Sequence, residues 1–218
     1  MPSALNEKDC EVVENTMGDQ ASSPITTKSP DRFDIAIRRP TIAEIGSTEV
    51  PQAVVRMINV VYGEAEKGLW KTGFVRTNVT EVSKWIDDEE LYLAFDTSTN
   101  HPSHLCIVGS VRVHEVERGI KSFGTLTVLP PYRSVGLGRR LVEFAESLAR
   151  SRGSETMQLE LAVPQPPDAH PQKEFLRKWY RKIGYEEARR STVEETIPHL
   201  LESFTGPMEF CVMQKQLQ

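Results

Sequence analysis

The stretch VLPPYRSVGLGRRLVEF, residues 128–144, decides the fold of this chain. An apolar run ends in two prolines, and a helical pattern begins immediately after a Gly-x-Gly at Gly136 and Gly138. A helix that begins at a glycine turn directs several backbone N–H groups, and the positive end of its dipole, at one point. The glycines carry no Cβ that would keep a phosphate away, and Arg133 and Arg139 add positive charge beside them. The junction therefore predicts a phosphate-binding site; the alternative is a helix start whose glycines serve tight packing alone.

Two other phosphate-binding motifs fit the junction poorly. A dinucleotide-binding turn requires a third glycine, and this chain has Leu141 at that position. A P-loop requires Gly-Lys-Ser or Gly-Lys-Thr, which the stretch lacks. A nucleotide-binding module therefore depends on the Gly-x-Gly alone and is the weakest of the functional interpretations.

The pattern on either side of the junction predicts the fold class. Strand-like runs cover residues 33–40, 90–95, 104–116, 121–129, 156–163, 185–192 and 206–217, and helical patterns cover residues 41–66, 79–88, 137–151, 171–183 and 193–203. Short polar links join the second, third and fourth strand-like runs, as in an antiparallel meander. We therefore expect an α+β fold (α/β with a mixed sheet), in which helices flank a central, mostly antiparallel sheet of about seven strands.

Composition and charge limit the function classes. The chain has 218 residues with 26 Lys+Arg against 31 Asp+Glu, a net charge of −5, which argues against a general nucleic-acid or anionic-membrane binder. Residues 1–30 contain no aromatic residue and end in a Ser/Thr/Pro cluster, so we expect a disordered tail ahead of one domain over residues 31–218. No signal pattern or run of ~18–20 apolar residues is present, and the three cysteines lie far apart. We expect a soluble cytoplasmic protein, with the nucleus left open, that acts without a metal.

Three stretches together carry a resemblance to a known family. They are LTVLPPYRSVGLGRRLVEFAESLARSRG (residues 126–153), LELAV (159–163) and FLRKWYRKIGYEE (175–187). In this order they resemble the GNAT superfamily of acetyl-CoA-dependent N-acetyltransferases. The resemblance is specific over about residues 122–186, and the order of elements follows the family from about Phe33 to the C-terminus. It implies a GNAT domain and an enzyme that moves an acetyl group from acetyl-CoA directly to an amine.

The resemblance also implies where acetyl-CoA binds. In this family the sheet splays between the strand before the glycine turn and the strand after the following helix, and the pantetheine arm lies in the gap. Carried over to this chain, the backbone of Leu126, Val128 and Leu129 contacts the arm and the thioester carbonyl. The diphosphate is held by the residues of the turn, which are Arg133, Ser134, Val135, Gly136, Leu137, Gly138 and Arg139.

Transfer to an amine requires a general acid and a general base. The resemblance places at Tyr180 the tyrosine that protonates the coenzyme A sulfur, and a phenol with a pKa of ~10 is protonated at neutral pH. The alternative is that Tyr180 is one more aromatic residue on the apolar stripe of its helix. Relatives often place the base at positions that match Ser122 and Gly124, which cannot titrate usefully here. Glu160 is the candidate base, as in relatives that acetylate α-amino groups, because a carboxylate inside a sheet is costly unless paired or functional; the alternative is that Glu160 faces solvent.

Two further pairs carry weaker signals. His114 and Glu115, at the end of the long meander strand, are reserve candidates for the base. The family often has an asparagine after Val163 that contacts pantetheine, and this chain has a proline-rich loop with Asp168 and His170 instead. These two residues either line the acceptor site or serve as helix-cap and turn residues, and cap and turn chemistry is the more common use.

The acceptor is the part of the function that the sequence leaves open. Tyr62 and Trp70 lie near the loop that borders the acceptor pocket in relatives, or they plug the core. The acceptor is an amine of a small molecule or of a protein or peptide, and we expect a monomer or a homodimer. A second interpretation, from another class, is a catalytically degenerate coenzyme A-binding regulatory protein, because the strand before the turn lacks the expected carboxylate or histidine.

Overall fold

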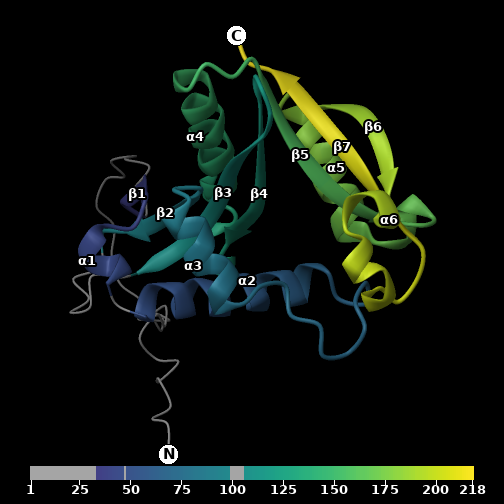
Figure 1. Cartoon of the computed structure of the whole chain (residues 1–218), viewed down its shortest axis with the longest axis horizontal. Helices are drawn as coiled ribbons and strands as arrows, with labels where there is room; N and C mark the ends of the chain where they lie inside the picture. Colours follow the sequence, from purple (N-terminus) through teal and green to yellow (C-terminus); the bar gives the residue numbers. More distant parts are fainter. Residues whose placement is uncertain (1–32, 47, 99–105) are drawn as a thin grey trace, which may run out of the picture. The chain divides into compact units, whose positions relative to one another are not determined.

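Runs of β-branched and aromatic residues form a single seven-stranded sheet in this computed structural model, which describes residues 33–46, 48–98 and 106–218 (Figure 1). The strands lie in the order β1-β2-β3-β4-β5-β7-β6. They are β1 (Ile35–Arg38), β2 (Leu91–Asp96), β3 (Ile107–Glu117), β4 (Ile120–Val128), β5 (Thr156–Pro164), β6 (Glu186–Thr192) and β7 (Met208–Gln216). All neighbouring pairs are antiparallel except β4 and β5, which are parallel. The predicted mixed sheet is confirmed; the predicted disordered tail lies outside the described residues.

Three of the helices in the described residues begin at a capping side chain. The helices are α1 (Ile42–Ile45), α2 (Glu49–Ala65), α3 (Val79–Asp87), α4 (Leu137–Ser151), α5 (Pro171–Lys182) and α6 (Val193–Thr196). At the start of α3 the Asn78 side chain accepts a hydrogen bond from the Glu81 N–H. At α6, Thr192 and Glu195 form the reciprocal hydrogen bonds of a capping box. Among the described residues, no helix has the length and apolar character needed to cross a membrane.

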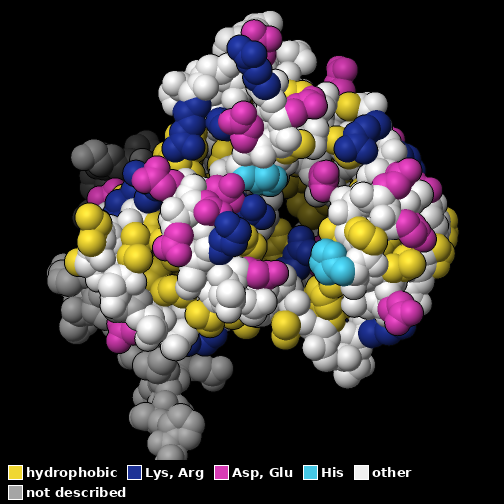
Figure 2. All heavy atoms as spheres, viewed as in Figure 1, with side chains coloured by type: hydrophobic (Ala, Val, Ile, Leu, Met, Phe, Trp, Pro, Cys, Tyr) yellow, Lys and Arg dark blue, Asp and Glu magenta, His cyan; other side chains and the backbone are white. Residues whose placement is uncertain are grey.

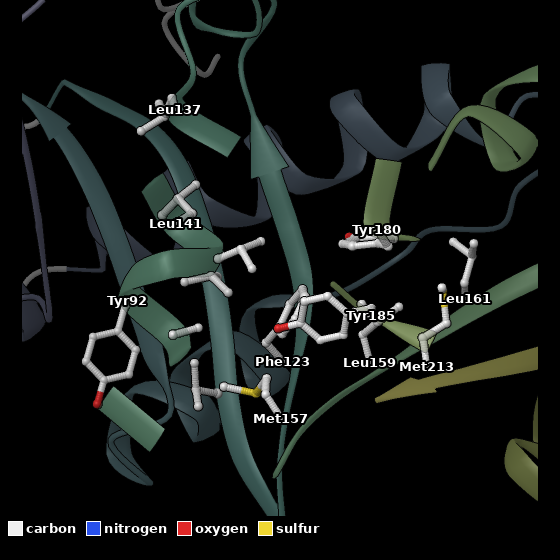
Figure 3. Packing of buried hydrophobic residues seen from close by; sticks show 14 of the residues in the cluster. Tyr92, Phe123, Leu137, Leu141, Met157, Leu159, Leu161, Tyr180, Tyr185 and Met213 are labelled. Atoms are coloured by element: carbon white, nitrogen blue, oxygen red, sulfur yellow. The ribbon is translucent and has the colours of Figure 1, made fainter. Parts of the chain in front are cut away.

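Alternation along β2 shows which helices cover which face of the sheet. Leu91, Leu93 and Phe95 pack in a cluster with residues of α2 and α3. Tyr92 and Ala94 point the other way and belong to a cluster that contains the apolar stripes of α4 and α5 (Figure 3). The helices α2 and α3 therefore cover one face, and α4 and α5 cover the other.

The sheet opens between its two parallel strands. β4 and β5 pair only where Ile120, Lys121 and Ser122 lie opposite residues 156–158. Beyond that point both strands continue without pairing to each other, and their ribbons diverge in Figure 1. The splay implied by the family resemblance is therefore present, and it leaves backbone N–H and C=O groups of both strands without a partner strand on the inner side.

A β-bulge in β4 lies inside this opening. Ser110 is paired with Thr127 and Arg112 with Gly124, so two steps along β3 match three steps along β4. Thr125 belongs to the bulged segment, and its φ of 51° lies in the left-handed region that is uncommon for a residue with a Cβ. Its carbonyl oxygen accepts hydrogen bonds from the hydroxyls of Ser110 and Thr127, each at 3.2 Å. These hydroxyls hold the bulge in place.

Candidate active site

The glycine turn is anchored to the sheet before α4 begins. A short 3-10 turn, Pro130–Tyr132, follows β4, and the Tyr132 hydroxyl donates a hydrogen bond of 2.8 Å to the buried Asp96 carboxylate. Gly136 is the N-cap of α4 with a φ of 83°, a left-handed conformation that favours glycine. The backbone of the turn therefore explains Gly136 without a ligand.

Gly138 is not explained by the protein's own packing. A Cβ placed on Gly138 would meet only the Val128 side chain, at the ordinary contact distance of 3.9 Å. The missing side chain leaves open space over the first turn of α4, where backbone N–H groups have no partner within the helix. This cradle, which a Cβ would fill, fits a phosphate group, and Arg133 and Arg139 line the same cavity.

A cavity of about 880 Å³ extends from the glycine turn into the gap between β4 and β5. Figure 2 shows the hollow near the middle of the view, with hydrophobic side chains inside it. Seven of the predicted acetyl-CoA-binding residues line it: Leu126, Val128, Arg133, Ser134, Gly136, Gly138 and Arg139. Three do not. The Leu129 N–H donates to the Val108 carbonyl at 3.0 Å, Leu137 is buried in the core, and Val135 is exposed to solvent.

Tyr180 lies on α5 and lines the cavity, with only 6% of its surface exposed. Its ring contacts Trp179, with 4.9 Å between ring centres, and it faces Phe123 across the gap at 6.0 Å (Figure 3). Burial, and to a smaller extent Tyr62, raise the pKa of the Tyr180 hydroxyl far above its ordinary value. Within the described part of the chain this hydroxyl makes no hydrogen bond. Tyr180 therefore stays protonated and has a proton to donate to a ligand.

Glu160 also lines the cavity but is not buried in the sheet. It projects from β5 on the side opposite Leu159 and Leu161, and its side chain is exposed. The expectation that a buried carboxylate needs a functional reason is therefore wrong for Glu160, because splaying of the strands gives it access to water. Its role as the base stays a prediction.

The other positions considered for the base are less favourable. Ser122 is buried where β4 still pairs with β5, and Gly124 offers only backbone to the cavity. His114 lies opposite Ser122 in β3 and does not line the cavity; burial lowers its pKa. Glu115 forms an ion pair of 3.0 Å with Lys121. The two reserve candidates are therefore not part of the cavity wall.

A charged and aromatic group lies where α2 ends and α5 begins. We call it the α2–α5 cluster: Tyr62, Glu66, Trp70, Arg76 and Lys173, all of which line the cavity. The Lys173 ammonium lies 2.5 Å from the Glu66 carboxylate, and both side chains are only 5% exposed. The Trp70 indole N–H donates to the other Glu66 oxygen at 2.6 Å. Although burial raises the pKa of Glu66, the charges of Lys173 and Arg76 hold it below its ordinary value, so Glu66 is ionised.

Only the two aromatic members of this cluster, Tyr62 and Trp70, were predicted from the sequence to lie near the acceptor pocket. Trp70 stacks between Phe74 and Phe204, with ring centres 3.8 and 4.1 Å away. Lys173 could have been recognised from the sequence as a buried charge, because it lies three residues before Leu176 and seven before Tyr180, on the apolar stripe of α5. A lysine on such a stripe needs a buried partner.

His170 occupies the N-cap position of α5, as its interpretation as a cap residue predicted, but its side chain makes no capping hydrogen bond. Its imidazole lines the cavity, with Nε2 3.3 Å from the Lys67 carbonyl oxygen. Nδ1 is buried and has no hydrogen-bond partner among the residues that the structure describes. The side chain of Asp168 is outside what the structure describes.

Comparisons with known proteins agree with this geometry. The profile of the acetyltransferase (GNAT) family matches residues 61–185. The uncharacterized protein YyaT of Bacillus subtilis strain 168 is 25% identical over 133 residues, which cover 58% of this chain and 82% of YyaT. A chain in the structure of the NatC complex bound to Gag peptide and CoA is 15% identical and matches with a TM-score of 0.58 over 85% of this chain and 100% of its own. The structure of yncA from Salmonella typhimurium, assigned as an acetyltransferase and solved with acetyl-CoA, is 13% identical, with a TM-score of 0.56 over 85% of this chain and 95% of its own.

Proposed function

Because the chain belongs to the acetyltransferase (GNAT) family, we propose that it transfers an acetyl group from acetyl-CoA directly to the nitrogen of an amine acceptor. One observation carries the proposal. A single cavity joins a glycine turn suited to a diphosphate, an unpaired stretch of two strands, and a protonated tyrosine, Tyr180. Acetyl-CoA has a diphosphate, an extended pantetheine arm and a thioester in the same order.

Acetyl-CoA would be held mainly by backbone. The N–H groups of residues 136–138 and the side chains of Arg133 and Arg139 are available to the diphosphate. The unpaired inner edges of β4 and β5 offer hydrogen bonds to the amides of the arm, in the way that a strand pairs with a neighbour. A backbone N–H near Val128 that reaches the thioester carbonyl oxygen would contribute ~2.7–4 kcal/mol to catalysis.

The acceptor nitrogen must lose a proton before it can attack. An alkylamine with a pKa of ~10.4 is almost entirely charged at neutral pH, so a base or a water chain is required. Three glutamates of the described residues line the cavity: Glu64, Glu66 and Glu160. Glu64 lies 3.5 Å from Arg133 and Glu66 is paired with Lys173, whereas Glu160 is exposed and has no ion-pair partner within the described residues. The departing sulfur takes a proton from Tyr180. Among the described residues that line the cavity there is no cysteine, which supports direct transfer.

Release of free thiol from acetyl-CoA in the presence of an amine panel tests the proposal. Turnover with at least one amine supports it. Tight binding of acetyl-CoA by calorimetry without turnover on any amine would instead favour the degenerate coenzyme A-binding regulatory protein, which the residues at 122 and 124 also suggest.

The base is tested separately with Glu160→Gln. Because Gln cannot accept the acceptor's proton, we expect the acid limb of the pH–rate profile to flatten and kcat to fall by roughly 10²–10⁴-fold. The profile of kcat against pH is the measurement. An unaltered acid limb assigns proton removal to water or to another group.

A further inference from the structure

Arg76 lies in the segment between α2 and α3 and lines the cavity with a half-buried side chain. Its guanidinium carbon lies 5.0 Å from the centre of the Tyr62 ring, a cation–π arrangement. The other arginines of the cavity have carboxylate partners: Arg133 lies 3.5 Å from Glu64, and Arg139 lies 2.9 Å from Glu143. Within the described residues, Arg76 has no carboxylate within ion-pair distance.

The surroundings of Arg76 contain more positive than negative charge. In the α2–α5 cluster, the single carboxylate of Glu66 lies between two cations, Lys173 and Arg76, whose charges both act on it. Both oxygens of Glu66 are already engaged, one by Lys173 at 2.5 Å and one by the Trp70 indole at 2.6 Å. Arg76 therefore feels the charge of Glu66 but has no carboxylate oxygen to bind within the described residues, and a partly desolvated guanidinium without such a partner is costly. An anion that enters the cavity would remove this cost.

The remaining wall of the cavity is suited to the rest of such a ligand. Glu160 stands on β5, exposed to the cavity, where a protonated amine would be attracted before it is deprotonated. The aromatic side chains of Tyr62, Trp70 and Phe210 give the space between these charges an apolar lining. Positive and negative groups on different elements around one cavity match a ligand that carries both an amine and an anion.

We propose that Arg76 binds a carboxylate of the acceptor, so that the acceptor is an amine with a carboxylate close to it, as in a free α-amino acid. The proposal rests on the proposed acetyl transfer for the role of this ligand. The planar guanidinium presents two parallel N–H donors, which match a carboxylate in geometry as well as in charge. A polyamine or another purely cationic acceptor would meet repulsion from Arg76 and Lys173 at this place.

The test uses matched pairs of ligands that differ only in the carboxylate. L-methionine, L-phenylalanine and L-glutamine are compared with their C-terminal amides, both as acceptors in the thiol-release assay and as ligands in calorimetry with coenzyme A present. We expect the wild-type protein to prefer the acid of each pair by at least ~10-fold, which a charged hydrogen-bonded pair can supply. Arg76→Gln should reduce this preference by roughly 10- to 100-fold, and Arg76→Lys should reduce it less.

Lys71→Gln is the matched control. Lys71 carries the same charge in the same segment but is exposed and does not line the cavity, so its removal should leave the preference for acids as in the wild type. Thermal unfolding of each variant confirms that the proteins compared are folded.

The two proposals fail in different ways. If acids bind in preference to amides through Arg76 but no amine releases thiol, acetyl transfer is contradicted and the carboxylate site stands. If amines are acetylated but acids and amides serve equally well in both assays, or if Arg76→Gln leaves the preference intact, the carboxylate site is overturned.

Discussion

At the glycine turn, the groups offered to a ligand are backbone N–H groups of neighbouring residues, and the side chains nearby, Arg133 and Arg139, are exposed. In the α2–α5 cluster, the groups offered are side chains from separate elements, and the central pair, Glu66 and Lys173, is almost fully buried. Exposed ion pairs contribute little to stability, whereas a buried pair is expensive to break. Substitutions at the turn should therefore weaken ligand binding and leave folding unchanged. Substitutions in the α2–α5 cluster should affect the stability of the fold as well as the choice of acceptor.

Tyr180→Phe should give the largest functional effect, because in the proposed function the arm held at the turn and the acceptor held at the cluster meet at Tyr180. We expect kcat to fall by roughly 10²–10⁴-fold, the usual contribution of a general acid. The KM for acetyl-CoA should change little. Steady-state kinetics with varied acetyl-CoA is the measurement.

Tyr92→Phe is the control for this substitution, since Tyr92 is also a buried tyrosine but contacts Arg152 on the core side of β2. It should retain wild-type turnover. Equal turnover of the Tyr180→Phe and wild-type proteins would remove Tyr180 from the mechanism.

Glu66→Gln should give the largest loss of stability. It leaves the Lys173 charge buried without a counter-charge, and we expect the free energy of unfolding to fall by ~3–5 kcal/mol. Denaturant unfolding measures this change. The exposed pair of Lys84 and Asp88 provides the comparison, because Asp88→Asn should cost less than ~1 kcal/mol.

The double variant Glu66→Gln with Lys173→Met sharpens the interpretation. Removing both charges should restore part of the stability, because no unpaired charge is then buried.

The dependence of stability on pH has a sign that follows from the pKa of Glu66. Since the folded-state pKa of Glu66 lies below its ordinary value, its stabilising contribution is present above that ordinary value and is lost as the pH falls through the folded-state pKa. A loss below 1 kcal/mol in Glu66→Gln would show that the cluster behaves like the surface pairs.

Gly138→Ala should give the smallest but most specific effect. The added Cβ meets nothing closer than 3.9 Å in the described part of the chain, and Ala is the better helix former by roughly 0.5–1 kcal/mol. Thermal unfolding without ligand should therefore show an equal or higher midpoint. Calorimetry should show acetyl-CoA affinity weakened by about tenfold or more, because the Cβ occupies the space of the diphosphate. Unchanged affinity would indicate that the diphosphate does not approach Gly138.

The same contrast explains which parts of the site could be predicted from sequence. The turn is built by residues that are adjacent in the chain, so its glycines, the prolines before it and the apolar stripe of α4 are visible as a local pattern. The α2–α5 cluster is assembled by folding: Lys173 lies 107 residues after Glu66, and no spacing rule joins these two residues to Arg76. Only Lys173, as a charge on an apolar stripe, gave a local signal.

Two features of the sheet could also not be predicted from a local sequence pattern. The bulge at Thr125 has no glycine at the residue with positive φ, and hydroxyls from two strand positions hold it. The exposure of Glu160 follows from the splay, which depends on the pairing of β4 with β5 and not on residues around 160. Long-range pairing decided both outcomes.

A crystal structure of the protein with coenzyme A tests the central claim most directly. We predict the diphosphate on the backbone N–H groups of residues 136–138, the pantetheine arm between the unpaired parts of β4 and β5, and the sulfur within hydrogen-bonding reach of the Tyr180 hydroxyl. Coenzyme A bound elsewhere, or a gap between β4 and β5 that stays empty at saturating ligand, would contradict the account.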